Sequence, residues 1–140
     1  MSTFNLEVVA IDKVFYKGPC EFMVFPGLDG EQGILPGHEV MVAAVKAGEL
    51  RCKVSETENM VAAVGDGFVE ILGDKVVLIA DFVEKAEDID EMRAQRAKER
   101  AEERLKAKQS EREFIHSQAA LARAMARLKV SSKYKKQKKI

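Results

Sequence analysis

The sequence predicts a β-sandwich, or flattened barrel, over residues 1–84, followed by a two-helix antiparallel hairpin over residues 85–140. Short apolar segments separated by turn residues fill the first part, as is typical of sandwiches and barrels. No glycine or proline occurs after residue 85, and Ala, Glu, Lys, Arg and Gln dominate there, which favours helix. The net charge changes from −8 in the first part to +8 in the second.

Seven segments of the first part are interpreted as strands because each is four to six residues long and apolar, and several alternate with polar residues. They are residues 6–11, 20–25, 42–45, 49–54, 60–64, 68–72 and 75–80. Residues with turn chemistry separate them at 16–19, 46–48, 65–67 and 73–74. Gly73-Asp74 lies between two strand segments and predicts a tight hairpin.

Residues 25–38 hold four glycines and two prolines, a composition that specifies a compact run of turns rather than a disordered linker. The apolar pair Ile34-Leu35 is expected to fold back onto the core. A rigid loop at the surface usually carries a contact. The polar residues expected to face outward are Asp29, Glu31 and His38.

Two helices are predicted in the second part. Acidic residues at 88–91 open the first helix, where the helix dipole favours them. Ser110 and Glu113 have the spacing of a capping box that starts the second helix, after a break near Gln109. The apolar residues expected to face the partner helix are Met92, Ala94, Ala97, Ala101 and Leu105 on the first helix, and Phe114, Leu121, Ala122, Met125 and Leu128 on the second.

Alanine-rich faces bury little apolar surface. Each buried methylene contributes only about 0.8 kcal/mol, so a docked and an opened hairpin can be close in free energy. The hairpin therefore fits a conformational switch, and it equally fits a fixed coiled hairpin of low hydrophobicity.

Five motifs, in this order and spacing, resemble those of the epsilon subunits of bacterial F-type ATP synthases, and the resemblance covers nearly the whole chain. Two positions depart from the family pattern, because Val40 replaces a proline and Asp66-Gly67 replaces a Gly-Gly pair. The motifs are PGLDGEQGILPGH at 26–38, GFVEI at 67–71, VVLIAD at 76–81, EKAEDID at 84–90 and ARAMARLKV at 122–130.

The resemblance implies a noncatalytic rotor subunit of the central stalk. Such a subunit couples ion translocation to ATP synthesis and inhibits ATP hydrolysis through a mobile C-terminal hairpin. The implied partners are the gamma subunit, the ring of c subunits and the catalytic beta subunits. The implied location is the cytoplasmic face of the bacterial inner membrane, where the subunit is peripheral. No cofactor is implied, apart from a regulatory ATP.

Three sets of site residues follow from the resemblance. The c-ring contact falls on Asp29, Gly30, Glu31 and His38, although the same residues fit a solvated acidic turn. Regulatory ATP falls on Glu84, Asp90, Arg93, Arg123 and Arg127, because Arg side chains hold phosphates and carboxylates accept hydrogen bonds from adenine or ribose.

The pair Arg123 and Arg127, four residues apart, also fits an exposed basic stripe. The third set is the contact with an acidic helix of beta, which falls on Arg112, Arg123, Arg127 and Lys129. From Lys133 onward the lysine-rich end is expected to be a solvated or frayed terminus.

Other classes of function find little support. The sequence holds no Walker, GxSxG or HExxH motif and no metal-ligand spacing, so an enzyme is not predicted. The apolar runs are too short for a membrane span, and Cys20 and Cys52 are expected to be buried free thiols. A nucleic-acid-binding hairpin would need more aromatic residues than Phe114 and Tyr134. A generic coiled-coil scaffold stays open, but it leaves the loop motif without a purpose.

Overall fold

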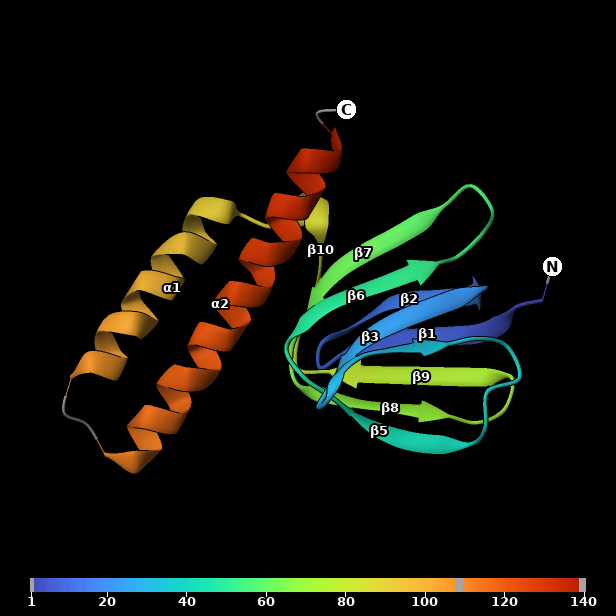
Figure 1. Cartoon of the computed structure of the whole chain (residues 1–140), viewed down its shortest axis with the longest axis horizontal. Coiled ribbons are helices and arrows are strands. Elements are labelled where there is room, and N and C mark those ends of the chain that lie inside the picture. Colours follow the sequence, from blue (N-terminus) through green and yellow to red (C-terminus); the bar gives the residue numbers. More distant parts are fainter. Residues whose placement is uncertain (1, 108–109, 139–140) are drawn as a thin grey trace.

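The computed structural model describes residues 2–107 and 110–138. Within these residues, ten strands form two five-stranded sheets, and two helices follow them (Figure 1). The predicted β-sandwich with a C-terminal helical hairpin is confirmed. The strands are β1 Phe4–Ala10, β2 Lys13–Cys20, β3 Phe22–Gly27, β4 Gly30–Ile34, β5 Met41–Val45, β6 Gly48–Lys53, β7 Asn59–Val64, β8 Gly67–Ile71, β9 Lys75–Ala80 and β10 Val83–Lys85.

One sheet has the order β2-β1-β9-β8-β5 and the other has the order β10-β7-β6-β3-β4. In the described part of the chain, paired strands are antiparallel except for β1 and β9, which run parallel. Alternate side chains of both sheets point inward and form one apolar core, as the period-two pattern predicts. Cys20 and Cys52 lie in this core as free thiols, which confirms that expectation.

Two turn predictions are wrong because edge strands tolerate turn residues. Residues 16–19 belong to β2, and the loop predicted at 25–38 contains β4, which pairs with β3 as a hairpin. Both β2 and β4 are outer strands of their sheets, where glycine and proline do least harm to the ladder of hydrogen bonds. Ile34 is buried as expected, but Leu35 is exposed.

A short 3₁₀ turn, η1 Ala86–Asp88, leads from β10 into the helices α1 Glu91–Lys106 and α2 Glu111–Lys138. The backbone N–H of Arg93 donates to the side chain of Asp90, which caps α1. The N–H of Glu113 donates to the Ser110 hydroxyl at 3.2 Å, as the capping box predicts. The predicted break near Gln109 lies outside the described residues.

The predicted apolar faces of the helices are only partly right. Ala94 and Ala101 of α1 are buried, whereas Met92, Phe114 and Met125 are exposed. Small residues form the true inner face of α2, because helices approach each other closely only where side chains are short. The buried residues of α2 are Ser117, Ala124, Ala126, Val130 and Ser131.

The helix α2 lies between α1 and the sandwich (Figure 1), and it contacts β6, β7 and η1. The apolar part of this contact is a small cluster around Ala63, Ala86 and Val130, separate from the sandwich core. Val61, Phe82, Ile89 and Tyr134 border it. The sandwich therefore has a complete core of its own, and the hairpin is attached through a minor interface.

Candidate functional site

A pocket of about 400 Å³ opens where the two helices meet the chain that leaves the sandwich. This volume lies within the range of small-molecule sites in proteins. It forms because β10, η1 and the capped start of α1 converge on the middle of α2. The lining residues are Glu84, Asp88, Asp90, Arg93, Ala94, Ala97, Arg100 and Arg127.

Arg127 is held firmly at the wall of this pocket. Its Nε donates to Glu84 Oε1 at 3.0 Å, and its guanidinium lies 4.0 Å from the centroid of the Phe82 ring. Both the ion pair and the cation–π contact orient the guanidinium plane. Arg127 and Glu84 are each about one-third exposed, so a ligand can reach them.

The structure brings together four of the five residues predicted for ATP. Glu84, Asp90, Arg93 and Arg127 line one pocket, whereas Arg123, one turn before Arg127, is half-buried and is not among the lining residues. Besides lining the pocket, the carboxylate of Asp90 caps the N-terminus of α1.

Sequence reasoning missed Arg100, which also lines the pocket. A signal for it was present, because Arg100 follows Arg93 by seven residues and two helical turns place both on one face of α1. Three arginines from two helices thus line one pocket. This arrangement can hold a polyanion such as a chain of phosphates.

The residues predicted for the c-ring contact do not lie at one point. Asp29 lies in the exposed two-residue turn between β3 and β4, and Gly30 begins β4 with a φ of 119° that only glycine adopts readily. Glu31 follows Gly30 in this return strand. His38 follows the far end of β4, so the length of this strand separates it from the turn.

Glu31 is paired within the chain. Its carboxylate accepts hydrogen bonds from Arg51 Nη1 at 2.6 Å and from Nη2 at 3.4 Å. These hydrogen bonds hold the pKa of Glu31 below its usual value, and the charges of Arg51, Lys129 and Lys133 lower this pKa further. Since β3 lies between β4 and β6, the pair bridges a strand on the outer face of the sheet.

The residues predicted to contact beta are spread along α2. Arg112 and Lys129 are exposed and Arg123 is half-buried, whereas Arg127 is engaged with Glu84 and Phe82. Arg112 also borders a pocket of about 650 Å³ at the tip of the hairpin.

Lys133 and Lys135 are exposed, as expected of a solvated end, but both are helical and paired, so this part of the terminus is not frayed. The helix α2 continues to Lys138, and Lys133 Nζ lies 3.0 Å from Glu49 Oε1. Lys135 pairs with Glu91 at 2.8 Å, and Ser131 donates to the same carboxylate. Hydrogen bonds from Lys135 and Ser131 lower the pKa of Glu91. The end of α2 is thus docked by opposite charges.

No group of His, Cys, Asp and Glu residues in the described ranges could hold a metal ion. Over the same ranges, neither helix is long and apolar enough to cross a membrane.

Two family models match consecutive parts of the chain. The model of the ATP synthase, Delta/Epsilon chain, beta-sandwich domain matches residues 3–86. The model of the ATP synthase, Delta/Epsilon chain, long alpha-helix domain matches residues 87–132. Both matches coincide with the sandwich and the hairpin seen in the structure.

Curated relatives carry the name ATP synthase epsilon chain. The protein of Ruminiclostridium cellulolyticum is 45% identical over 95% of this chain and 98% of its own length. That of Syntrophomonas wolfei is 39% identical over 94% of this chain and 96% of its own length. A chain in the OSCP/F1/c-ring structure of the Euglena gracilis mitochondrial ATP synthase has the same fold, with a TM-score of 0.81 at 20% identity over 94% of this chain and 82% of that one.

Sandwich and hairpin together are the two-domain architecture that these family models describe. The chain belongs to the ATP synthase delta/epsilon chain family, and the relatives that match nearly its full length are epsilon chains.

Proposed function

We propose that the chain is a noncatalytic rotor subunit in the central stalk of an F-type ATP synthase, where it couples ion translocation to ATP synthesis and restrains ATP hydrolysis through its hairpin. Family membership supports the place in the complex. The proposed partners are the gamma subunit, the c-ring and the catalytic beta subunits. The proposed location is the cytoplasmic face of the bacterial inner membrane, as a peripheral subunit.

The minor interface of the hairpin carries the proposal of a mobile regulator. The sandwich closes its own core, and α2 is attached to it by a small apolar cluster and by the ion pairs of Glu84 and Glu49. Partly exposed ion pairs contribute little net free energy. The hairpin can therefore leave the sandwich without unfolding it, which an inhibitor that switches between two positions requires.

Deletion of residues 86–140 tests the inhibition. All ten strands end at or before Lys85, so the truncated subunit keeps its sheets. In the assembled enzyme we expect the rate of ATP hydrolysis to rise by a factor of about two or more, which corresponds to about 0.4 kcal/mol of barrier. Subunit stoichiometry of the purified complex is the control for assembly. An unaltered rate in a fully assembled complex would refute inhibition by the hairpin.

We also propose that the turn at Asp29–Gly30, with Glu31, contacts the c-ring. Charge reversal by Glu31→Lys should lower the yield of ATP per ion translocated, because the rotor then loses an acidic contact. The measurement is made with the hairpin removed, so that effects on the docking of α2 cannot contribute. Glu56→Lys, with the same charge change in the exposed β6–β7 turn, is the matched control. Equal coupling in both variants would reject the contact.

A second proposed activity is the binding of regulatory ATP in the pocket beside Arg127. Its support is the convergence of Arg93, Arg100 and Arg127 with Glu84 and Asp90 around one opening. Bound ATP would join β10, α1 and α2 and thereby hold the hairpin docked. Calorimetric titration of the full chain with ATP is expected to show saturable heat. The absence of heat at millimolar ATP would exclude the site.

A further inference from the structure

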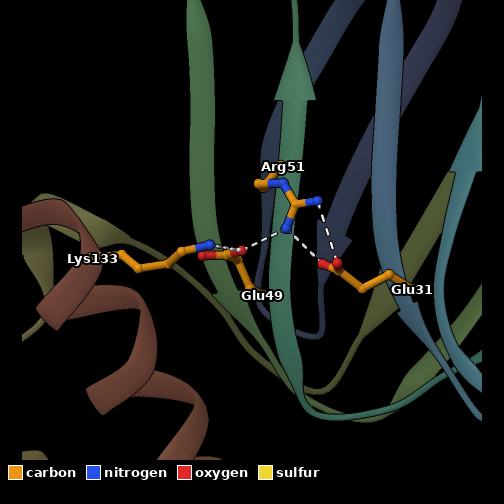
Figure 2. Close-up of polar contacts among 4 residues, drawn as sticks. All are labelled: Glu31, Glu49, Arg51 and Lys133. Carbon is orange, nitrogen blue, oxygen red and sulfur yellow. Dashed lines mark hydrogen bonds and ion pairs between the residues drawn. The ribbon is translucent and has the colours of Figure 1, made fainter. Parts of the chain in front are cut away.

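Four charged side chains of alternating sign connect the β3–β4 hairpin to the end of α2 (Figure 2). Glu31 of β4 pairs with Arg51 of β6, Arg51 pairs with Glu49 of the same strand, and Glu49 pairs with Lys133 of α2. Glu49 and Arg51 are two residues apart, so both point to the same side of the sheet. None of the sequence motifs singles out Glu49, Arg51 or Lys133.

Glu49 is the buried centre of this network. Its side chain is only 2% exposed, and its Oε1 lies 2.7 Å from Arg51 Nη1 and 3.0 Å from Lys133 Nζ. A buried carboxylate is costly unless opposite charges and hydrogen bonds compensate it. When α2 leaves the sandwich, Glu49 loses Lys133 and keeps Arg51 alone. The pairing with Lys133 therefore favours the docked hairpin.

Arg51 divides its positive charge between two carboxylates. The same nitrogen, Nη1, contacts Glu31 at 2.6 Å and Glu49 at 2.7 Å. While Glu31 neutralises part of the charge of Arg51, Glu49 is less neutralised by Arg51 and attracts Lys133 more strongly. If a cation from elsewhere neutralises Glu31, Arg51 turns fully to Glu49 and repels Lys133 more strongly. Hydrogen bonds from Arg51, and then the charges of Arg51, Lys129 and Lys133, lower the pKa of Glu31, so this carboxylate attracts the end of α2 through space as well as through Arg51.

We propose that Glu49, Arg51 and Lys133 form a latch on the docked hairpin, and that Glu31 sets the strength of this latch, so that a basic side chain of a partner that binds Glu31 loosens the end of α2. The inference rests on the proposed mobility of the hairpin. It adds a direction of coupling, in which occupation of the β3–β4 turn and docking of α2 oppose each other.

Amide hydrogen exchange of the isolated full chain tests the latch without any ATPase assay. The variants Glu31→Gln and Glu31→Lys change the charge in two steps at a residue whose carboxylate is hydrogen-bonded to Arg51 of β6. We expect exchange in residues 127–136 to accelerate by about twofold to fivefold for Gln and more for Lys, in line with the coupling of exposed ion pairs. Amides of β8 and β9 should keep their protection, which reports an intact sandwich.

Glu7 supplies the matched control. It pairs with Lys17 and Lys75 on the other sheet, and Glu7→Gln and Glu7→Lys repeat the two charge steps there. Exchange in α2 should stay unchanged in these variants. If the Glu31 variants accelerate α2 no more than the Glu7 variants do, the coupling is refuted.

Lys133→Met tests whether Glu31 acts on α2 through Lys133 or through the general effect of its charge. We expect this variant alone to accelerate exchange at the end of α2, and we expect Glu31→Gln to add little in its presence. A full additional effect of Glu31→Gln would overturn the network, because its route to α2 would not pass through Lys133. Either failure would leave the deletion assay untouched, since that assay reports inhibition by the whole hairpin in the assembled enzyme.

Discussion

Gly67→Ala is expected to destabilise the sandwich by about 3 kcal/mol or more, which exceeds the usual cost of overpacking. A Cβ atom at this position would overlap the carbonyl oxygen of Ile79 and lie 2.8 Å from the Cα atom of Ala80. Both are backbone atoms of β9, which pairs with β8 and cannot move aside alone. The measurement is the free energy of unfolding of the full chain in urea.

Gly18→Ala is the matched control for this prediction. Its Cβ would meet only the end of the Tyr16 side chain, at 3.0 Å from the hydroxyl oxygen, and a side chain gives way by a few tenths of an ångström more easily than paired backbone does. The expected cost is about 1 kcal/mol or less, since strand glycines contribute no packing of their own. Equal unfolding midpoints for the two variants would contradict the close approach of β8 and β9.

The tight packing at residues 65–67 also fixes the base of the hairpin. The N–H of Gly65 donates to the carbonyl of Phe82 at 3.0 Å, and a Cβ at Gly65 would overlap the Asp81 carboxylate. Phe82 is the ring over which the Arg127 guanidinium lies. The turn between the two sheets therefore positions the wall of the candidate nucleotide pocket.

The residue pattern of a segment predicted those elements whose structure depends mainly on the segment itself. Alternation predicted most of the inner strands, and the loss of glycine and proline after residue 85 predicted the helices. The alternation of apolar and polar residues failed to predict β2 and β4, where turn residues occupy edge strands. It also failed to predict β10, a three-residue strand that is too short for a periodic signal. In each failure the pairing partner, and not the segment itself, decides the structure.

Long-range ion pairs were beyond sequence reasoning for a different reason. Lys133 and Glu49 lie 84 residues apart and Arg127 and Glu84 lie 43 apart. Whether these ion pairs form depends on the angle at which α2 crosses β6 and β7, and the hydrophobic periodicity of the sequence does not predict this angle. The prediction that Lys133 belongs to a solvated end was reasonable for a lysine-rich terminus. Lys133 is indeed exposed, but its pairing with buried Glu49 could not be foreseen from the sequence.

The docking of α2 thus combines a small apolar cluster with ion pairs that each contribute little free energy. The small residues Ala124, Ala126 and Ser131 bring α2 close without burying much apolar surface. Ion pairs at Glu49, Glu84 and Glu91 then hold it in register. Two of these three carboxylates, Glu49 and Glu84, come from the sandwich and its last strand. Such an interface responds to changes in charge at its edges, which suits a regulator.

Arg127→Met is expected to weaken ATP binding to the isolated full chain by about 30-fold or more, since a charge-assisted contact to phosphate contributes about 2 kcal/mol. Arg127 is already oriented by Glu84 and Phe82, so it meets the ligand with little loss of side-chain entropy. Methionine keeps apolar contact with the Phe82 ring, which preserves the local packing. Calorimetric titration measures the dissociation constant.

Variants of two further arginines show whether ATP binds in the pocket beside Arg127 or elsewhere on the hairpin. Arg96→Met removes an exposed charge from α1 outside the pocket lining, and its affinity should stay within about twofold, the scale of a screened surface charge. Arg123→Met should cost less than Arg127→Met, because Arg123 is not among the lining residues. If all three variants lost affinity equally, ATP would be bound by the general positive field of the hairpin and not by the pocket beside Arg127.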